Sequence, residues 1–171
     1  DAFTGATHQI TLRAPELDAH GLVQLRTRTL NVKIPRGVRA GQIIRLAGQG
    51  APGLGGAPAG DLLLEVHFRP HSRLSAEGRD LRLSLPVAPW EAALGAVVTV
   101  DLPGGSLKVR IPEGAQSGKQ LRVRGKGIPG EPPGDLLLDI QVILPPADTP
   151  RARALYETLA KELAFDPRGR T

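Results

Sequence analysis

The sequence predicts a mostly β protein, built of two tandem β-sandwich-like domains and followed by a short C-terminal helix. Its 171 residues include 21 glycines and 16 prolines, whereas aromatic residues make up only 3% of the chain. This content of turn-forming residues is too high for a helical bundle and is typical of many short strands joined by turns. Alternating apolar and polar residues and an internal repeat support the same prediction.

The repeat is the clearest pattern in the chain. Residues 30–53 and 107–130 share an Ile-Pro-x-Gly phrase, the same order of glycines and the same apolar positions at a constant offset. After loops of unequal length, both copies close on Gly-Asp-Leu-Leu-Leu, at residues 60–64 and 134–138. Because glycines, prolines and aliphatic residues coincide in order, the chain is two diverged copies of one module.

The repeat sets the expected domain boundaries and the alternation sets the expected strands. We expect a first domain at residues 1–71, a second at 72–148, and a terminal helix with its tail at 149–171. Strands are predicted at residues 6–13, 22–34, 43–47, 61–69, 80–86, 96–102, 107–111, 121–124 and 135–144. A long hairpin is predicted around residues 18–21, and a tight turn at residues 103–105 replaces it in the second copy.

The second copy has an opening strand, residues 81–86, with no counterpart in the first. The chain begins at Asp1, inside the segment that follows that strand in the second copy. We therefore expect the chain to start part-way through its first module and to derive from a longer parent protein. Without that neighbour, the first strand would expose Ile10 and Leu12, although ordinary core packing is the alternative for either residue.

Two helices are predicted. The shorter one, residues 89–94, begins with a proline and ends at Gly95, and Ala2 and Phe3 are the expected stub of its counterpart in the first copy. The longer one begins at an N-capping Thr149 and is expected to stop at residues 166–167, Asp-Pro. Its apolar residues recur at four-residue spacing and must bury against another surface. They are Leu155, Leu159 and Leu163, flanked by Tyr156.

Composition excludes several classes of site. The chain contains no cysteine, which excludes disulfides and thiolate–zinc sites. No apolar run approaches the roughly 18–20 residues needed to span a bilayer, and no signal peptide opens the chain. We therefore expect a cytoplasmic protein with no membrane partner. The net charge of +5 permits a loose attraction to nucleic acid.

The motifs that would suggest catalysis or cofactor binding lack their structural context. Residues 48–53 and 125–130 match G-x-G-x-x-G, but each loop leads into a predicted strand, so no helix N-terminus is available for a pyrophosphate. His67 and His71 have no further ligand for a metal. No Ser/His/Asp arrangement is recognisable by spacing. The sequence therefore predicts no enzyme, no cofactor and no metal site, with the glycines as turn formers.

The duplicated pattern Val-x-Ile-Pro-x-Gly-x-x-x-Gly, followed by Arg, Gly-x-Gly and Gly-Asp-Leu-Leu-Leu, resembles the two C-terminal domains of DnaJ-type J-domain co-chaperones. Residues 89–95, Pro-Trp-Glu-Ala-Ala-Leu-Gly, resemble the start of the second of these domains. The absence of cysteine is similar to the curved-DNA-binding-protein A (CbpA) group, which lacks a zinc-binding insert. The His-Pro-Asp signature of the J-domain is absent, so this chain alone is not expected to stimulate the ATPase of a DnaK-type partner.

The resemblance implies the DnaJ peptide-binding fold and a function as a co-chaperone fragment that holds unfolded polypeptides for a DnaK-type chaperone. In the family, extended client peptides bind an apolar groove of the first domain by β-augmentation. The matching positions here are Ile10, Leu12 and Leu64. Arg26 and Arg28, on a neighbouring strand, are the positions implied for the acidic tail of the partner chaperone.

The resemblance also implies a homodimer held by the terminal helix, through Leu155, Tyr156, Leu159 and Leu163. DNA binding, as in the CbpA group, is the alternative function. It ranks second because the chain has almost no aromatic residues to stack on bases and no basic helix.

Overall fold

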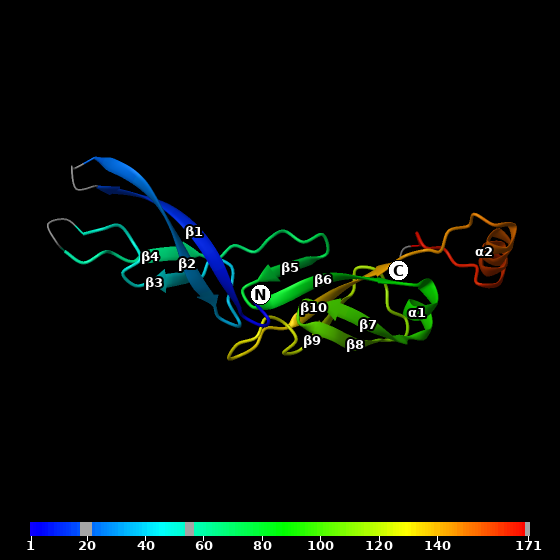
Figure 1. The fold of residues 1–171 in the computed structure, drawn as a ribbon. Helices are drawn as coiled ribbons and strands as arrows, with labels where there is room; N and C mark the ends of the chain where they lie inside the picture. The colour runs from blue at the N-terminus through cyan, green and yellow to red at the C-terminus, as the bar shows by residue number, and fades with distance from the viewer. Residues whose placement is uncertain (18–21, 54–56, 170–171) are drawn as a thin grey trace.

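The computed structural model describes residues 1–17, 22–53 and 57–169. The predicted hairpin turn at residues 18–21 lies outside them. The molecule is elongated, with the first copy of the repeat at one end, the second in the middle and the C-terminal helix at the far end (Figure 1). Among the described residues, no helix is both long and apolar enough to cross a membrane.

Strands dominate the described residues, which confirms the predicted mostly β fold. The elements of the first copy are β1 (Ala6–Leu17), β2 (Val23–Ile34), β3 (Ile43–Leu46) and β4 (Leu62–Glu65). Those that follow are β5 (Leu74–Glu77), β6 (Asp80–Val87), α1 (Pro89–Leu94), β7 (Ala96–Leu102), β8 (Gly105–Ile111), β9 (Gln120–Val123), β10 (Leu136–Val142) and α2 (Pro150–Glu162).

The first copy consists of two two-stranded antiparallel sheets. One is the long ribbon β1–β2, in which Ile10 lies opposite Leu30 and Leu12 opposite Arg28. The other is the short sheet β3–β4. Exposed residues alternate with half-buried or buried ones along β3, β4 and residues 27–34 of β2, as expected for a sheet with one covered face, whereas residues 23–27 of β2 are all exposed. The ribbon crosses over the short sheet (Figure 1).

The second copy repeats this arrangement and adds two strands. Its ribbon is β7–β8, and its other sheet has the order β5-β6-β10-β9. Strand β6 lies parallel to β10, with Leu81 opposite Leu136 and Leu83 opposite Leu138. The edge of β10 that β6 covers corresponds to the edge of β4 that has no partner strand in the described part of the chain.

The added strands explain where the main core lies. A single cluster of buried residues fills the space between the two sheets of the second copy. Its members are Leu81, Leu83, Leu85, Val87, Ala92, Val100, Val109, Ile111, Ala115, Ile128, Leu136, Leu138 and Ile140. Among the described residues of the first copy, only Val32 and Val38 are buried apolar side chains. The first copy therefore leaves much of its apolar face half exposed.

The structure corrects three sequence expectations about the elements. The strand predicted at residues 61–69 is a regular strand only at Leu62–Glu65, because its partner β3 is four residues long. Strand β5 was not predicted. Helix α2 ends at Glu162, before the Asp-Pro pair. By contrast, residues 2–4 form the single turn expected for the stub of a helix, closed by an i to i−4 hydrogen bond from the Gly5 amide to the Asp1 carbonyl (2.7 Å).

Candidate functional site

The candidate site begins with the inner face of the β1–β2 ribbon. Ile10 and Leu12 are both half-buried on this face. Arg28 shows which way this face points. It lies opposite Leu12 in the register, and its guanidinium donates to the carbonyl oxygens of Gln49 and Gly50 in the loop after β3. Ile10 and Leu12 therefore face the β3–β4 sheet, as ribbon residues that are only partly covered.

Leu64 lies on the facing layer. It pairs with Ile44 across the β3–β4 sheet, and both side chains are half-buried. The neighbouring Leu63 and Ile43 point the other way and are 62% and 52% exposed. The structure thus places the three predicted peptide-binding residues on two facing layers of one small domain, with apolar surface still accessible.

The free edge of β4 is the second part of the site. In the second copy, the amide of Leu81 donates to the carbonyl of Asp135 (2.8 Å), and the amide of Ile128 donates to the carbonyl of Arg79 (2.8 Å). These bonds hold the β5–β6 turn and the start of β6 against the end of the glycine loop. The equivalent positions in the first copy, Ala51 and Asp61, have no such strand beside them in the described residues. An unpaired edge of this kind exposes main-chain donors and acceptors to any extended segment.

The predicted acidic-tail residues lie on the inner face of β2. The Arg28 guanidinium is occupied by the two loop carbonyls, so it helps to hold the ribbon to the short sheet. Arg26 is two residues along the same face, opposite Ala14, and its side chain is exposed. Nothing in the sequence indicates the contact made by Arg28, because an arginine in a strand does not reveal which loop it meets.

The two glycine loops are fixed by a repeated carboxylate. Asp61 accepts hydrogen bonds from the Gly48 amide (2.9 Å) and the Arg45 Nε (2.5 Å). In the second copy, Asp135 accepts the equivalent bonds from the Gly125 amide (2.7 Å) and the Arg122 Nε (2.6 Å).

These bonds lower the pKa of the Asp61 and Asp135 carboxyls, first through the glycine amide and then through the arginine. Hydrogen bonding to the charged form favours ionisation. In each loop the amide of the first glycine therefore donates a hydrogen bond to an aspartate of the same chain. This supports the interpretation of the glycines as turn formers.

A cavity of about 930 Å³ lies between the two copies and was not predicted. Its walls include Val66 and Phe68 from the first copy and Leu74 and Leu81 from the second. The sequence could not indicate it, because its lining comes from segments that are far apart along the chain. Ile10, Leu12 and Leu64 are not part of this lining.

The histidines around this cavity make polar contacts with their own chain. The Nε2 of His8 lies 2.8 Å from the Asp1 carboxylate, and that of His67 lies 3.5 Å from Glu65. His71 Nδ1 accepts a hydrogen bond from the amide of Leu74 (3.1 Å) at the start of β5. No group of three or more potential metal ligands is found in the described part of the chain.

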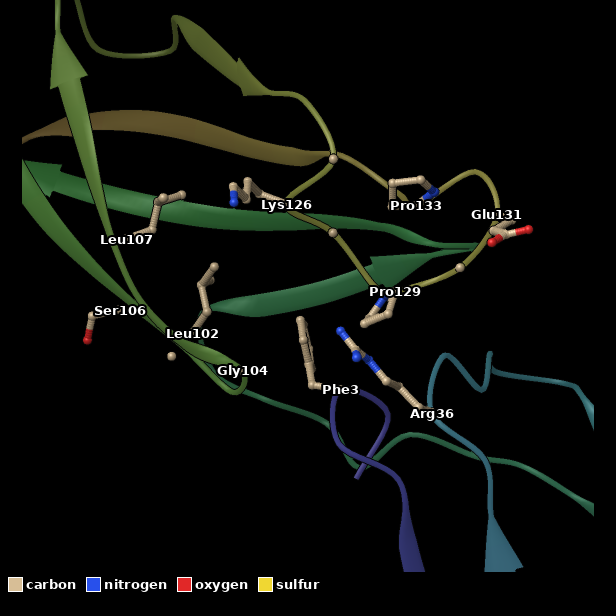
Figure 2. A pocket seen from close by; sticks show the side chains of 14 residues that line it. Phe3, Arg36, Leu102, Gly104, Ser106, Leu107, Lys126, Pro129, Glu131 and Pro133 are labelled. Atoms are coloured by element: carbon tan, nitrogen blue, oxygen red, sulfur yellow. The ribbon is translucent and has the colours of Figure 1, made fainter.

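A second interdomain cavity, of about 620 Å³, shows how the copies are joined (Figure 2). The ring of Phe3 stands between the β7–β8 turn and Pro129, with the Arg36 guanidinium close to that proline. A Cβ on Gly104 would come within 2.6 Å of the Phe3 ring, so a larger residue here would displace that ring. Phe3 also packs against the core of the second copy.

Helix α2 presents an exposed apolar strip. Leu155, Leu159 and Leu163 are 64%, 49% and 64% exposed, and no residue of the helix is buried. Thr149 caps the helix as predicted, accepting a hydrogen bond from the Ala152 amide (3.1 Å). Tyr156 differs from the leucines: it is half-buried, and its hydroxyl donates to the Pro145 carbonyl (2.6 Å).

Comparison with known proteins assigns the family. Residues 1–145 match the model of the DnaJ C terminal domain. The chain is 48% identical over 169 residues to the curved DNA-binding protein of Coxiella burnetii, covering 98% of this chain and 54% of that protein. It is 45% identical to the protein of the same name from Pseudomonas putida, with 98% and 54% covered. The identity to the Escherichia coli protein is 43%, with 98% and 56% covered.

The chain therefore spans about half the length of these curated relatives. The family match extends over both copies of the repeat and stops just before the C-terminal helix. The duplicated glycine and Gly-Asp-Leu-Leu-Leu phrases, the paired sheets and these matches agree. This chain belongs to the DnaJ C-terminal domain family.

Proposed function

We propose that the chain is the client-binding part of a cytoplasmic DnaJ-type co-chaperone, which holds unfolded polypeptides for a DnaK-type chaperone. The unpaired edge of β4, next to the half-buried Ile10, Leu12 and Leu64, is the observation that carries this proposal. An extended peptide added to that edge would gain main-chain hydrogen bonds with little dependence on sequence. Such tolerance suits a protein that holds many different unfolded chains.

Strand β6 of the second copy is a guide to how a client segment would lie on the edge of β4. Strand β6 lies parallel to β10 with Leu81, Leu83 and Leu85 buried on alternate positions. By analogy, a client segment would lie parallel to β4 and turn every second side chain toward the half-buried aliphatic residues of the first copy. Extended segments with aliphatic residues at alternate positions are therefore the preferred ligands.

Removing the two ribbon residues is expected to weaken client binding. Each half-buried aliphatic side chain contributes about 1 kcal/mol when a peptide covers it. The double variant Ile10→Ser/Leu12→Ser should therefore bind a fluorescent peptide with alternating leucines about 30-fold more weakly, as measured by fluorescence anisotropy.

A matched control is Ile43→Ser/Leu63→Ser, which removes the same amount of apolar side chain from the opposite, exposed face of β3–β4. This control should bind the peptide as the unmodified chain does. Equal affinities for the ribbon variant and the unmodified chain would reject the assignment of the peptide site.

The acidic tail of the partner chaperone is assigned to Arg26 and Arg28. A tail carboxylate would compete with the carbonyls of Gln49 and Gly50 for the Arg28 guanidinium. Arg26 lies two residues away on the same face of β2 and is exposed, so a tail could reach its side chain as well.

The exposed strip of α2 supports a homodimer. A 13-residue helix with no buried side chain is marginal on its own, and burial of its leucines against a second copy would stabilise it. Leu155→Ser/Leu159→Ser should convert a dimer into a monomer in sedimentation velocity, as should truncation after Ala147. Glu157→Ser/Lys161→Ser, on other faces of the same helix, should leave the dimer intact. A monomer for the unmodified chain at high concentration would contradict this proposal.

DNA binding is the second candidate function. The three relatives described above bear the name curved DNA-binding protein, and this chain carries a net charge of +5. Retardation of a duplex at low salt, lost as the salt concentration rises, is the expected behaviour.

A further inference from the structure

One face of the β1–β2 ribbon is exposed along its whole described length. On each strand, every second residue points away from the β3–β4 sheet and is exposed. These residues are Thr7, Gln9, Thr11, Arg13 and Pro15 on β1, and Val23, Leu25, Thr27, Thr29, Asn31 and Lys33 on β2. We call them the outer face of the ribbon. Its polar part consists of hydroxyl, amide and cationic groups.

The outer face carries positive charge without a neutralising carboxylate. None of its residues is acidic, and neither Arg13 nor Lys33 takes part in an ion pair in the described part of the chain. Arginines on other sheets differ. The Nε atoms of Arg45 and Arg82 each lie 2.5 Å from an aspartate, and an Arg122 nitrogen lies equally close to a third.

The shape of the ribbon suits a nucleic acid groove. Each strand has 12 residues, so at about 3.4 Å per residue the ribbon is roughly 40 Å long. It extends past the short sheet at one end of the molecule (Figure 1). A two-stranded ribbon can enter the major or the minor groove of duplex DNA, where its hydroxyl and amide groups can meet phosphates and base edges.

The end of the face nearest the hairpin turn is apolar. Val23 and Leu25 are 68% and 72% exposed, and Pro15 lies opposite Leu25. Proline and aliphatic side chains are the types that architectural proteins insert between base steps, which bends the duplex. The outer face thus carries Arg13 beside this apolar end and Lys33 at the opposite end of the ribbon, with hydroxyl and amide groups between them.

From these observations we infer that the outer face of the β1–β2 ribbon is the surface that contacts duplex DNA. The inference rests on the second candidate function, and it assigns DNA and client peptides to opposite faces of one ribbon. Ile10 and Leu12 point toward the short sheet, whereas Arg13 and Lys33 point away from it. The same element therefore serves both ligands through different side chains.

Charge reversal with a matched control tests the cations. Arg13→Glu/Lys33→Glu should weaken the binding of a fluorescent duplex and lower the magnitude of the slope of log K against log salt by about 2, since two phosphate contacts are lost. The control is Lys108→Glu/Arg110→Glu on the outer face of β7–β8, where Arg110 is the repeat equivalent of Lys33 and Asp101 shares the face. This control makes the same change in net charge and should lower the slope by less than half as much.

Site-specific cross-linking tests the location directly. Because the chain has no cysteine, Thr29→Cys on β2 and Thr99→Cys on β7 of the other ribbon can each carry a single photo-activated cross-linker. The duplex should cross-link at position 29 and not at position 99. A labelled unfolded polypeptide serves as the second probe in each reaction.

The possible outcomes distinguish failure of the ribbon assignment from failure of DNA binding itself. If the unmodified chain fails to retard DNA at low salt, DNA binding is rejected and the inference with it. If DNA binds but cross-links at position 99, or both charge reversals act equally, the ribbon is rejected while DNA binding stands. If position 29 cross-links the polypeptide and not the duplex, the outer face belongs to clients and the inference is wrong.

Discussion

Leu138→Ala is expected to lower the free energy of unfolding of the second copy by about 2–5 kcal/mol. Leu138 is fully buried (0% exposed) at the centre of the four-stranded sheet, between Leu83 on β6 and Leu121 on β9. Truncation removes apolar contacts and leaves a cavity among strands that are hydrogen-bonded on both sides and so have little freedom to collapse. Equilibrium urea unfolding, followed by circular dichroism and by Trp90 fluorescence, measures the loss.

The repeat supplies the control for this change. Leu64 is the equivalent of Leu138 in the Gly-Asp-Leu-Leu-Leu phrase, but it is half-buried on a strand with one partner. Leu64→Ala should cost about 1 kcal/mol, because less apolar area is lost and surrounding water fills the space. Equal costs for the two variants would show that β4 is covered in solution as completely as β10.

This asymmetry suggests a division of labour between the two copies. The second copy buries the apolar faces of its strands in its own core, because β6 covers the far edge of β10 and Phe3 packs onto the same cluster. The first copy keeps the same aliphatic positions without that cover. Under the proposed function, the first copy would offer this accessible apolar area to clients, and the second copy, with its own buried core, would support it.

Much of the fold could be predicted from the sequence because the repeat states each pattern twice. Alternation located β1, β2 and β10 in long segments, and Pro89 and Gly95 marked the ends of α1. Strand β5 was missed because its four residues, Leu-Ser-Ala-Glu, include one large apolar side chain and have no equivalent in the first copy. Its existence depends on β6, against which it pairs, and not on its own sequence.

The candidate site was predictable in part. Ile10, Leu12 and Leu64 were chosen from strand alternation and family resemblance, and the structure places them on facing layers. The role of Arg28 and the interdomain cavities could not be predicted, since each depends on which distant loops meet. Tyr156, expected in the dimer strip with the leucines, hydrogen-bonds to its own chain at Pro145.

Gly134→Ala is expected to be the other severe substitution, with a loss of about 3 kcal/mol. A Cβ at this position would overlap the backbone carbonyl of Arg79, in the β5–β6 turn. Backbone atoms cannot move aside as a side chain can, and that carbonyl already accepts the Ile128 amide (2.8 Å). Thermal denaturation followed by Trp90 fluorescence should show the midpoint falling by several degrees.

Gly60 is the repeat equivalent of Gly134. Its substitution tests peptide binding without the packing defect expected at Gly134. A Cβ on Gly60 meets no atom nearer than the Ala51 carbonyl oxygen at 3.9 Å, so Gly60→Ala should be neutral or stabilising by up to about 1 kcal/mol. The space that Arg79 fills beside Gly134 is open beside Gly60 in the described residues. If a client lies on β4 as β6 lies on β10, its leading residues cross that space, and Gly60→Ala should weaken peptide binding in the anisotropy assay without lowering stability. Unchanged binding would show that clients use the edge of β4 in a different register or not at all.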